Sequence, residues 1–441
     1  MPKRMGLLFA LACWLACPLF PRQLLARQAH TAPAQVTAIK FGTLITEDGE
    51  SQVLKDAVVL VEGDRIRSVG AGLAIPAGAK VIDLSGYTGM PGMIDMHTHI
   101  TYAWRGIPGT NPMQQMNAML PQELVFHAEK NARRCLEIGV TTVRDLMARN
   151  YNDIALRNLI NEGYVEGPRM FVAGPALMIT SAAPRYDQVF PWILPSEGQV
   201  DGVAEIMKKI RQEVAAGVDV IKMFGSTGGF NNVVTHQTFT YEEMAAAVET
   251  AHTLGKRIAV HSYQASGARD AARAGADTIE HAAGVDDATF QMMVQKDITY
   301  DPTVYHNDWY AENYKLFGWG QKDIDALHDY TAQVMATITR AHSDHVRISM
   351  GSDAIFDLFG KQTNELAYLV KAGLTPAEAV DAATKNGAYA LGMSDTLGAV
   401  APDHFADIVA VQGDPLSNID AAVHGVRWVM KGGKVVVDRI Q

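Results

Sequence analysis

Two histidines one residue apart, His97 and His99, follow a short apolar run that begins after Pro91-Gly92. In an extended strand, residues i and i+2 point to the same side, so both imidazoles can bind one metal ion. Imidazole and carboxylate groups are usual ligands of zinc, and a catalytic zinc site keeps one position open for water. The pair therefore predicts half of a metal site whose remaining ligands lie elsewhere in the chain.

Polar residues that end or follow other apolar runs can supply those ligands. Lys222 lies in "DVIKMF", and His261 and His281 end "RIAVH" and "DTIEH". Asp353 follows "VRISMGS". Each has an ordinary structural alternative, such as a hydrogen-bonded histidine, a lysine whose amine reaches water, or an aspartate that caps a helix. The whole set favours a metal site, because so many candidate ligands at the ends of such runs are not expected by chance.

The apolar runs themselves alternate with helical patterns in a regular order. Such alternation predicts an α/β protein with a parallel (β/α)₈, TIM-like barrel. In this fold the carboxyl ends of the strands converge on one face, where the active site forms. The barrel would therefore bring the six candidate residues together. The predicted strands are residues 93–97, 139–145, 169–174, 219–224, 257–261, 277–281, 298–305 and 346–353.

The two ends of the chain have a different pattern from the middle. Residues 37–84 and 406–439 contain short alternating runs with turns between them, such as Gly63-Asp64, which predict strands and hairpins. Their similarity predicts one small β-sandwich domain built from both chain ends. We place its parts at residues 35–89 and 394–441 and the barrel at residues 90–393.

The first 34 residues predict a secretory signal peptide. Lys3 and Arg4 precede an apolar run too short for a membrane span, and Ala32-Pro33-Ala34 fits a cleavage site. We expect a periplasmic or secreted protein that is free of the membrane once the signal is removed; an uncleaved N-terminal anchor is the alternative. Removal would leave Cys135 as the single cysteine, so no intrachain disulfide is expected.

Composition narrows the classes of partner. The chain has 441 residues, 48% of them hydrophobic, and a formal net charge of −10. It contains no basic run, so nucleic acid is not an expected partner. Whether the barrel forms a homo-oligomer stays open, because nothing in the sequence identifies an interface.

The residue types also predict how such a site would work. His97 and His99 could bind one ion, and His261 and His281 a second. A lysine is a poor bridge between two cations, but carboxylation would make Lys222 an anionic carbamate able to span ions about 3.5–4 Å apart. Two ions would activate a water molecule, and Asp353 would accept its proton and pass it to the leaving amine.

The motifs "PGMIDMHTH", "VIKMF", "HSYQ", "IEH" and "GSDA" resemble the metal-site signature of the amidohydrolase superfamily. The resemblance extends over nearly all of the chain after residue 34, including the tail "ADIVAVQGDPLSNI". In detail the chain is similar to the imidazolonepropionase-related branch, which includes Xaa-Pro dipeptidases, metallo-carboxypeptidases and ochratoxin-hydrolysing amidohydrolases. This resemblance implies two divalent ions, with zinc expected, bridged by carboxylated Lys222. Imidazolonepropionases proper use one metal and lack the lysine, so Lys222 and the signal peptide argue against that activity.

Substrate contacts are predicted from loops at the same face of the barrel. The resemblance implies a glycine-rich loop over the site at Ser226-Thr227-Gly228-Gly229, and "HSYQ" departs from the usual fifth-strand motif at Tyr263. Position alone adds further candidates, and Arg185 is the candidate partner of a substrate carboxylate. The predicted contacts are Ser226, Gly228, Gly229, His236, Tyr263, Tyr305, His306 and Arg185.

The leading hypothesis is a binuclear metal-dependent hydrolase that cuts an amide or peptide bond next to a carboxylate. A dipeptidase, a carboxypeptidase or an N-acyl amino acid hydrolase, including one for ochratoxin-type amides, would fit this chemistry. A hydrolase that opens cyclic amides or lactones is the alternative within the enzyme class, because the same activated water would serve it. From another class, a noncatalytic binding protein on the same barrel is the alternative.

Overall fold

The computed structural model describes residues 35–47, 53–181, 197–229 and 235–440. The predicted signal segment, residues 1–34, and the candidate carboxylate partner Arg185 lie outside these ranges. No helix within them is both long and apolar enough to cross a membrane.

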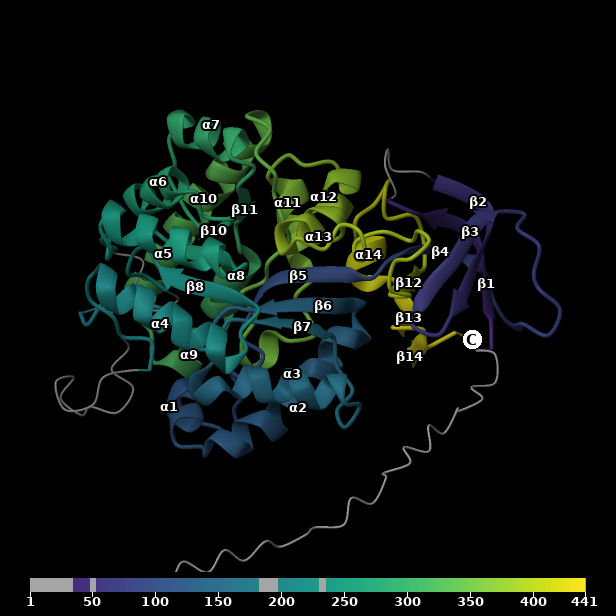
Figure 1. Cartoon of the computed structure of the whole chain (residues 1–441), viewed down its shortest axis with the longest axis horizontal. Helices are drawn as coiled ribbons and strands as arrows, with labels where there is room; N and C mark the ends of the chain where they lie inside the picture. Colours follow the sequence, from purple (N-terminus) through teal and green to yellow (C-terminus); the bar gives the residue numbers. More distant parts are fainter. Residues whose placement is uncertain (1–34, 48–52, 182–196, 230–234, 441) are drawn as a thin grey trace, which may run out of the picture. The chain divides into compact units, whose positions relative to one another are not determined.

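The middle of the chain forms a parallel barrel of strands with helices around it (Figure 1). One sheet has the order β5-β6-β7 and a second has the order β11-β10-β9-β8. The two sheets are joined next to β7, where Leu177 forms a parallel bridge with Met223 of β8. The strands are β5 (Met93–Thr98), β6 (Val140–Asp145), β7 (Arg169–Val172), β8 (Val220–Phe224), β9 (Arg257–Ser262), β10 (Thr278–His281) and β11 (Thr299–Asp301).

The eighth predicted strand, residues 346–353, takes the expected place but is not a regular strand. Ile348 forms a parallel bridge with Tyr300 of β11, and Ala354 forms one with Thr98 of β5, so this segment closes the barrel. The expected ladder is interrupted because Asp353 adopts a φ of +50°, which lies outside the β region. Gly351 allows close packing here, since a Cβ at this position would collide with the Asp301 carboxyl group.

Helices connect the strands and bury their apolar sides against them. Helix α5 shows why they begin where they do: Thr240 accepts a hydrogen bond from the amide of Glu243, whose side chain bonds back to Thr240. The helices are α1 (Pro112–Asn117), α2 (Pro121–Glu137), α3 (Asn152–Asn161), α4 (Val203–Ala216), α5 (Tyr241–Thr253), α6 (Ala265–Ala274), α7 (Asp287–Gln295), α8 (Tyr305–Glu312), α9 (Tyr314–Phe317), α10 (Gln321–Ser343), α11 (Asn364–Lys371), α12 (Pro376–Ala382), α13 (Lys385–Leu391) and α14 (Asp420–His424).

The two chain ends share one seven-stranded sheet of order β14-β13-β12-β4-β1-β2-β3. Its centre joins the ends directly, because Gly89 of β4 pairs with Ala410 of β12 (Figure 1). Strands from both halves contribute to one apolar core that includes Phe41, Val59 and Trp428. The strands are β1 (Thr37–Ile45), β2 (Val53–Glu62), β3 (Arg65–Ala71), β4 (Lys80–Pro91), β12 (Ile408–Val411), β13 (Val426–Lys431) and β14 (Lys434–Asp438).

The passage from this sheet into the barrel fixes where the first site strand begins. β4 ends at Pro91 and β5 starts at Met93, so a single residue, Gly92, separates the two strands. A Cβ at Gly92 would overlap the Thr141 side chain of β6, which makes glycine the residue that fits. β5 is buried along its whole length and carries His97 near its carboxyl end.

Candidate metal centre

The six predicted metal-site residues lie together at the carboxyl ends of the barrel strands, and we call them the histidine cluster. Asp353 Oδ1 lies 3.0 Å from His99 Nε2 and 3.6 Å from His97 Nε2. Lys222 Nζ lies 3.4 Å from His97 Nε2. The His281 ring centroid is 4.8 Å from that of His97 and 4.5 Å from that of His261. The cluster consists of His97, His99, Lys222, His261, His281 and Asp353.

Three of these imidazoles are held by an oxygen atom at Nδ1. His97 Nδ1 lies 2.8 Å from Glu280 Oε2, and His281 Nδ1 lies 2.6 Å from Thr303 Oγ1. His99 Nδ1 lies 3.4 Å from the Met147 carbonyl oxygen. Such contacts fix the ring orientation and leave Nε2 as the nitrogen that can bind a metal ion.

Three of the histidines are in the neutral form that binds metal ions. Burial, with the nearby Lys222 amine, lowers the pKa of His97 to about 3. Burial lowers the pKa of His261 and His281 as well, so all three imidazoles are neutral at physiological pH. His261 Nε2 is buried and has no hydrogen-bond partner among the described residues. Neutral imidazoles, one orphaned nitrogen and a carboxylate form a donor set that fits a divalent metal ion.

The two remaining members of the cluster differ in charge. Burial opposes ionisation of Asp353, but the imidazoles of His306, His97 and His99 hold its pKa below the usual range, so the carboxylate is ionised. Burial lowers the pKa of Lys222 to about 8, and the side chain is 1% exposed. A neutral amine is therefore accessible at Lys222 close to physiological pH.

The backbone is left-handed at two of the six positions. His281 has a φ of +70° and Asp353 has a φ of +50°. Residues other than glycine rarely adopt this conformation, and it concentrates at functional sites, where the surrounding structure offsets its cost of about 1–3 kcal/mol. At both positions the turn comes where a strand or strand-like segment ends at the catalytic face.

Buried charges that sequence reasoning missed lie directly against the histidine cluster. Arg144 of β6 donates to Glu280 Oε1 at 2.9 Å and lies 3.5 Å from Asp301 Oδ2. We call Arg144, Glu280 and Asp301 the arginine–carboxylate cluster; each is at most 2% exposed. In the sequence, the one indication of this cluster is that charged residues stand inside short apolar runs ("TTVRD", "TIEH", "ITYD"). Pairing them requires knowing which strands face one another across the barrel.

Two groups of three residues in the described ranges bring potential ligand atoms within 4.8 Å of one another. One is His97, His99 and Asp353, and the other is His97, Glu280 and Asp301. In the second group, Glu280 and Asp301 contact the guanidinium of Arg144, which already compensates their negative charge. We therefore assign candidate metal binding to the histidine cluster.

The predicted glycine-rich loop supports Tyr263. The hydroxyl of Ser226, which is fully buried, accepts hydrogen bonds from the backbone amides of Tyr263 and Gln264. Gly228 has a φ of +117°, and a Cβ there would lie 2.9 Å from the Tyr263 side chain. A Cβ added at Gly229 would meet none of the described residues within 4 Å. Ser226 and Gly228 thus position the neighbouring loop that carries Tyr263.

The other predicted contact residues separate into two sets. The Tyr263 hydroxyl lies 3.5 Å from His306 Nε2, which in turn lies 3.5 Å from Asp353 Oδ2, so both side chains belong to the site. Tyr305 is directed elsewhere, with its ring 5.8 Å from that of Tyr368. His236 is exposed and lies 3.2 Å from the Thr227 hydroxyl through Nδ1.

A parallel α/β barrel with histidines and a carboxylate at its carboxyl ends is an architecture of barrel hydrolases. The chain belongs to the amidohydrolase family, whose sequence profile matches residues 88–436. It is 27% identical to an ochratoxinase from Aspergillus niger over 444 residues, which cover 92% of this chain and 88% of the relative. It is 24% identical to an imidazolonepropionase from Bacillus cereus over 84% of this chain and 89% of the relative.

Solved structures show the same relationship. The crystal structure of a Xaa-Pro dipeptidase with bound methionine matches with a TM-score of 0.80 and 28% identity, covering 91% of this chain and 99% of that one. The predicted fold class and superfamily branch are thereby confirmed. The chain is an amidohydrolase-type hydrolase that acts on amide bonds.

Proposed function

We propose that this protein is a binuclear metal-dependent hydrolase that cuts an amide or peptide bond next to a carboxylate. The observation that carries the proposal is the convergence of four histidines, a buried lysine and an ionised aspartate at one end of the barrel. His97 and His99 would hold one ion, and His261 and His281 the other. Zinc suits these nitrogen and oxygen ligands. Two such ions, when bound, supply an acidified water molecule and polarise the scissile carbonyl group.

Lys222 is the proposed bridge between the two ion positions. Its buried amine, with a pKa of about 8, provides the lone pair that would form an N–C bond with carbon dioxide. Loss of one proton from nitrogen leaves a carbamate with two oxygen ligands. The 3.4 Å separation between Lys222 Nζ and His97 Nε2 supports this role, since it puts the end of the lysine among the imidazoles.

Asp353 is the proposed proton carrier. It is ionised, and its two oxygens face different groups: Oδ1 lies 3.0 Å from His99 Nε2, and Oδ2 lies 3.5 Å from His306 Nε2. A carboxylate in this position can accept a proton from the attacking water and deliver it to the leaving nitrogen. His306 orients the carboxylate from the opposite side, and the nearby Tyr263 hydroxyl can hydrogen-bond a bound substrate.

The substrate proposal follows the names of the relatives, one an ochratoxinase and the other a Xaa-Pro dipeptidase. We propose that the substrate carries a carboxylate beside the scissile amide and that Arg185 binds this carboxylate. The test is hydrolysis of a library of dipeptides and N-acyl amino acids by purified, zinc-loaded protein, monitored by product release. Cleavage of amides next to a carboxylate is expected. Hydrolysis confined to cyclic amides or lactones would replace the proposal by a ring-opening activity, and binding without hydrolysis would indicate a noncatalytic protein.

A further inference from the structure

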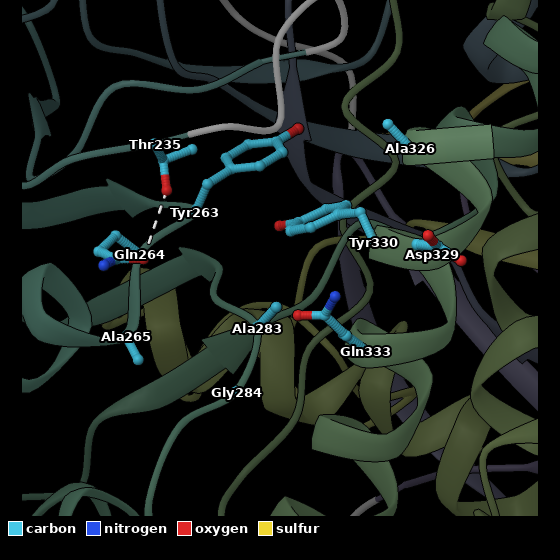
Figure 2. A pocket seen from close by; sticks show the side chains of 10 residues that line it. All are labelled: Thr235, Tyr263, Gln264, Ala265, Ala283, Gly284, Ala326, Asp329, Tyr330 and Gln333. Carbon is cyan, nitrogen blue, oxygen red and sulfur yellow. Dashed lines mark hydrogen bonds between the residues drawn. The ribbon is translucent and has the colours of Figure 1, made fainter. Parts of the chain in front are cut away.

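A cavity of about 410 Å³ lies beside the histidine cluster, on the far side of Tyr263. Its walls come from the segments after β8, β9 and β10 and from helix α10 (Figure 2). The volume is in the range of small-molecule binding sites and is large enough for one extended side chain. We call this cavity the α10 pocket.

Tyr263 belongs to both the pocket and the candidate metal centre. One side of its ring faces the histidine cluster, with centroids 4.9 Å from His281 and 5.2 Å from His261. The ring also stacks on Tyr330 of α10, with a centroid distance of 4.6 Å and an interplanar angle of 14° (Figure 2). The same side chain therefore borders both the candidate metal centre and the α10 pocket.

The pocket contains a buried hydrogen-bonding group without a protein partner. Tyr330 is 5% exposed, and its hydroxyl has no hydrogen-bond partner among the described residues. Figure 2 shows this hydroxyl directed toward the side of the pocket where Gln264 and Ala283 lie. Leaving such a group unpaired costs about 1–3 kcal/mol, so a ligand that supplies an acceptor or donor there gains that free energy back.

The charge of the lining restricts the kind of ligand. Among the described residues that line the pocket, Asp329, which is exposed on α10, is the single charged one, and none of them is a lysine, arginine or histidine. The amides of Gln264 and Gln333 add neutral donors and acceptors. A carboxylate placed here would lose hydration without gaining a cation, whereas an amide, a phenol or an ammonium group would find partners.

We propose that the α10 pocket is a subsite for a substrate side chain, and that it accepts an uncharged hydrogen-bonding or basic side chain and disfavours an acidic one. This inference rests on the proposed function, because it assigns the part of an amide substrate that lies away from the scissile bond. The carboxylate beside that bond would lie outside this pocket.

The test uses dipeptides in which one residue is Gly, Gln, Glu or Lys, varied first on the acyl side and then on the amine side. Binding is measured by calorimetry with the full-length Asp353→Asn variant, and turnover is measured with the parent enzyme. In one of the two series the Gln peptide is expected to bind at least about tenfold more tightly than its near-isosteric Glu counterpart. Equal dissociation constants for Gly, Gln and Glu in both series would overturn the proposal.

Variants on α10 assign the selectivity to this pocket. Ala326→Phe fills the pocket and is expected to abolish the preference for Gln over Gly, whereas Ala332→Phe, at an exposed position on the same helix, keeps it. Tyr330→Phe should weaken binding of the Gln peptide by about three- to tenfold, and Asp329→Asn should weaken the Lys peptide selectively. A preference that survives Ala326→Phe would overturn the proposal. Selective binding by a protein that hydrolyses none of the peptides would uphold the subsite while refuting the proposed reaction.

Discussion

The histidine cluster and the arginine–carboxylate cluster are adjacent and linked through the contact of His97 with Glu280, yet their charges are arranged differently. In the arginine–carboxylate cluster, Arg144 neutralises Glu280, whose pKa lies below its ordinary range despite its burial. Burial and the neighbouring Glu280 raise the pKa of Asp301 well above its usual value, which favours its protonated form. One guanidinium and one carboxylate leave this cluster balanced without a metal ion.

The histidine cluster lacks such a fixed balance. The imidazoles of His97, His261 and His281 are neutral, Asp353 is ionised, and Lys222, whose pKa is about 8, supplies a cation. Carboxylation would turn that cation into a second anion, and only bound cations could then compensate the buried charge. The arginine–carboxylate cluster is therefore a charge-balanced support, whereas the histidine cluster is a site that bound ions would complete.

The largest expected effect is on turnover. Asp353→Asn keeps the shape of the side chain but removes the proposed proton acceptor, so kcat should fall about 10²–10⁴-fold while metal content is retained. Steady-state kinetics and elemental analysis check the two parts. Asp344→Asn, at an exposed helix end, is the matched control and should keep kcat. Wild-type turnover in Asp353→Asn would show that the residue is not the base.

A large effect on stability is expected from the arginine–carboxylate cluster. Arg144→Met removes the cation that compensates the buried Glu280 carboxylate, which should lower the free energy of unfolding by about 3–5 kcal/mol. Urea denaturation measures this change. Arg134→Met removes a part-exposed ion pair to Asp357 of 3.0 Å and should cost less than about 1 kcal/mol. If Arg144→Met were equally mild, the proposed charge balance would be wrong.

The contact between His97 and Glu280 joins the two clusters, so a change at Glu280 should alter the affinity of the histidine cluster for metal ions. Glu280→Gln replaces the acceptor that holds His97 Nδ1, so affinity for the ion at His97 should fall about 10–100-fold. Competition with a chelator of known affinity measures this loss in the folded protein. Glu249→Gln, on the exposed side of α5, serves as the control. Unchanged affinity in Glu280→Gln would separate the two clusters functionally.

A smaller effect is expected at His281, whose Nδ1 contact is a neutral hydroxyl rather than a carboxylate. Thr303→Val preserves shape but removes that oxygen, and metal affinity should fall about tenfold, at the low end of such effects. Thr303→Ser keeps the hydroxyl and should retain affinity. Equal affinities of the Val and Ser variants would contradict a role for the hydroxyl.

The barrel was predictable because its strands appear in the sequence as short apolar runs that alternate with helical patterns. The six candidate ligands were predictable because they stand at or near the ends of such runs, and a parallel barrel brings the carboxyl ends of its strands together. The arginine–carboxylate cluster was not, since Arg144, Glu280 and Asp301 come from three strands and their pairing depends on the closed barrel. The sequence also did not show that the Ser226 hydroxyl accepts hydrogen bonds from the backbone of the loop after β9. The sequence around a serine does not show which distant backbone group its hydroxyl will hydrogen-bond in the folded chain.

The central claim is that bound cations complete the histidine cluster through Lys222. The most direct measurement is the metal content of the purified chain and of Lys222→Ala, by elemental analysis, with activity followed before and after chelation. We predict two divalent ions per chain, at most one in Lys222→Ala, and activity that is lost on chelation and restored by zinc. A parent protein that hydrolyses amides without bound metal, or a Lys222→Ala variant with unchanged metal content and turnover, would contradict the account.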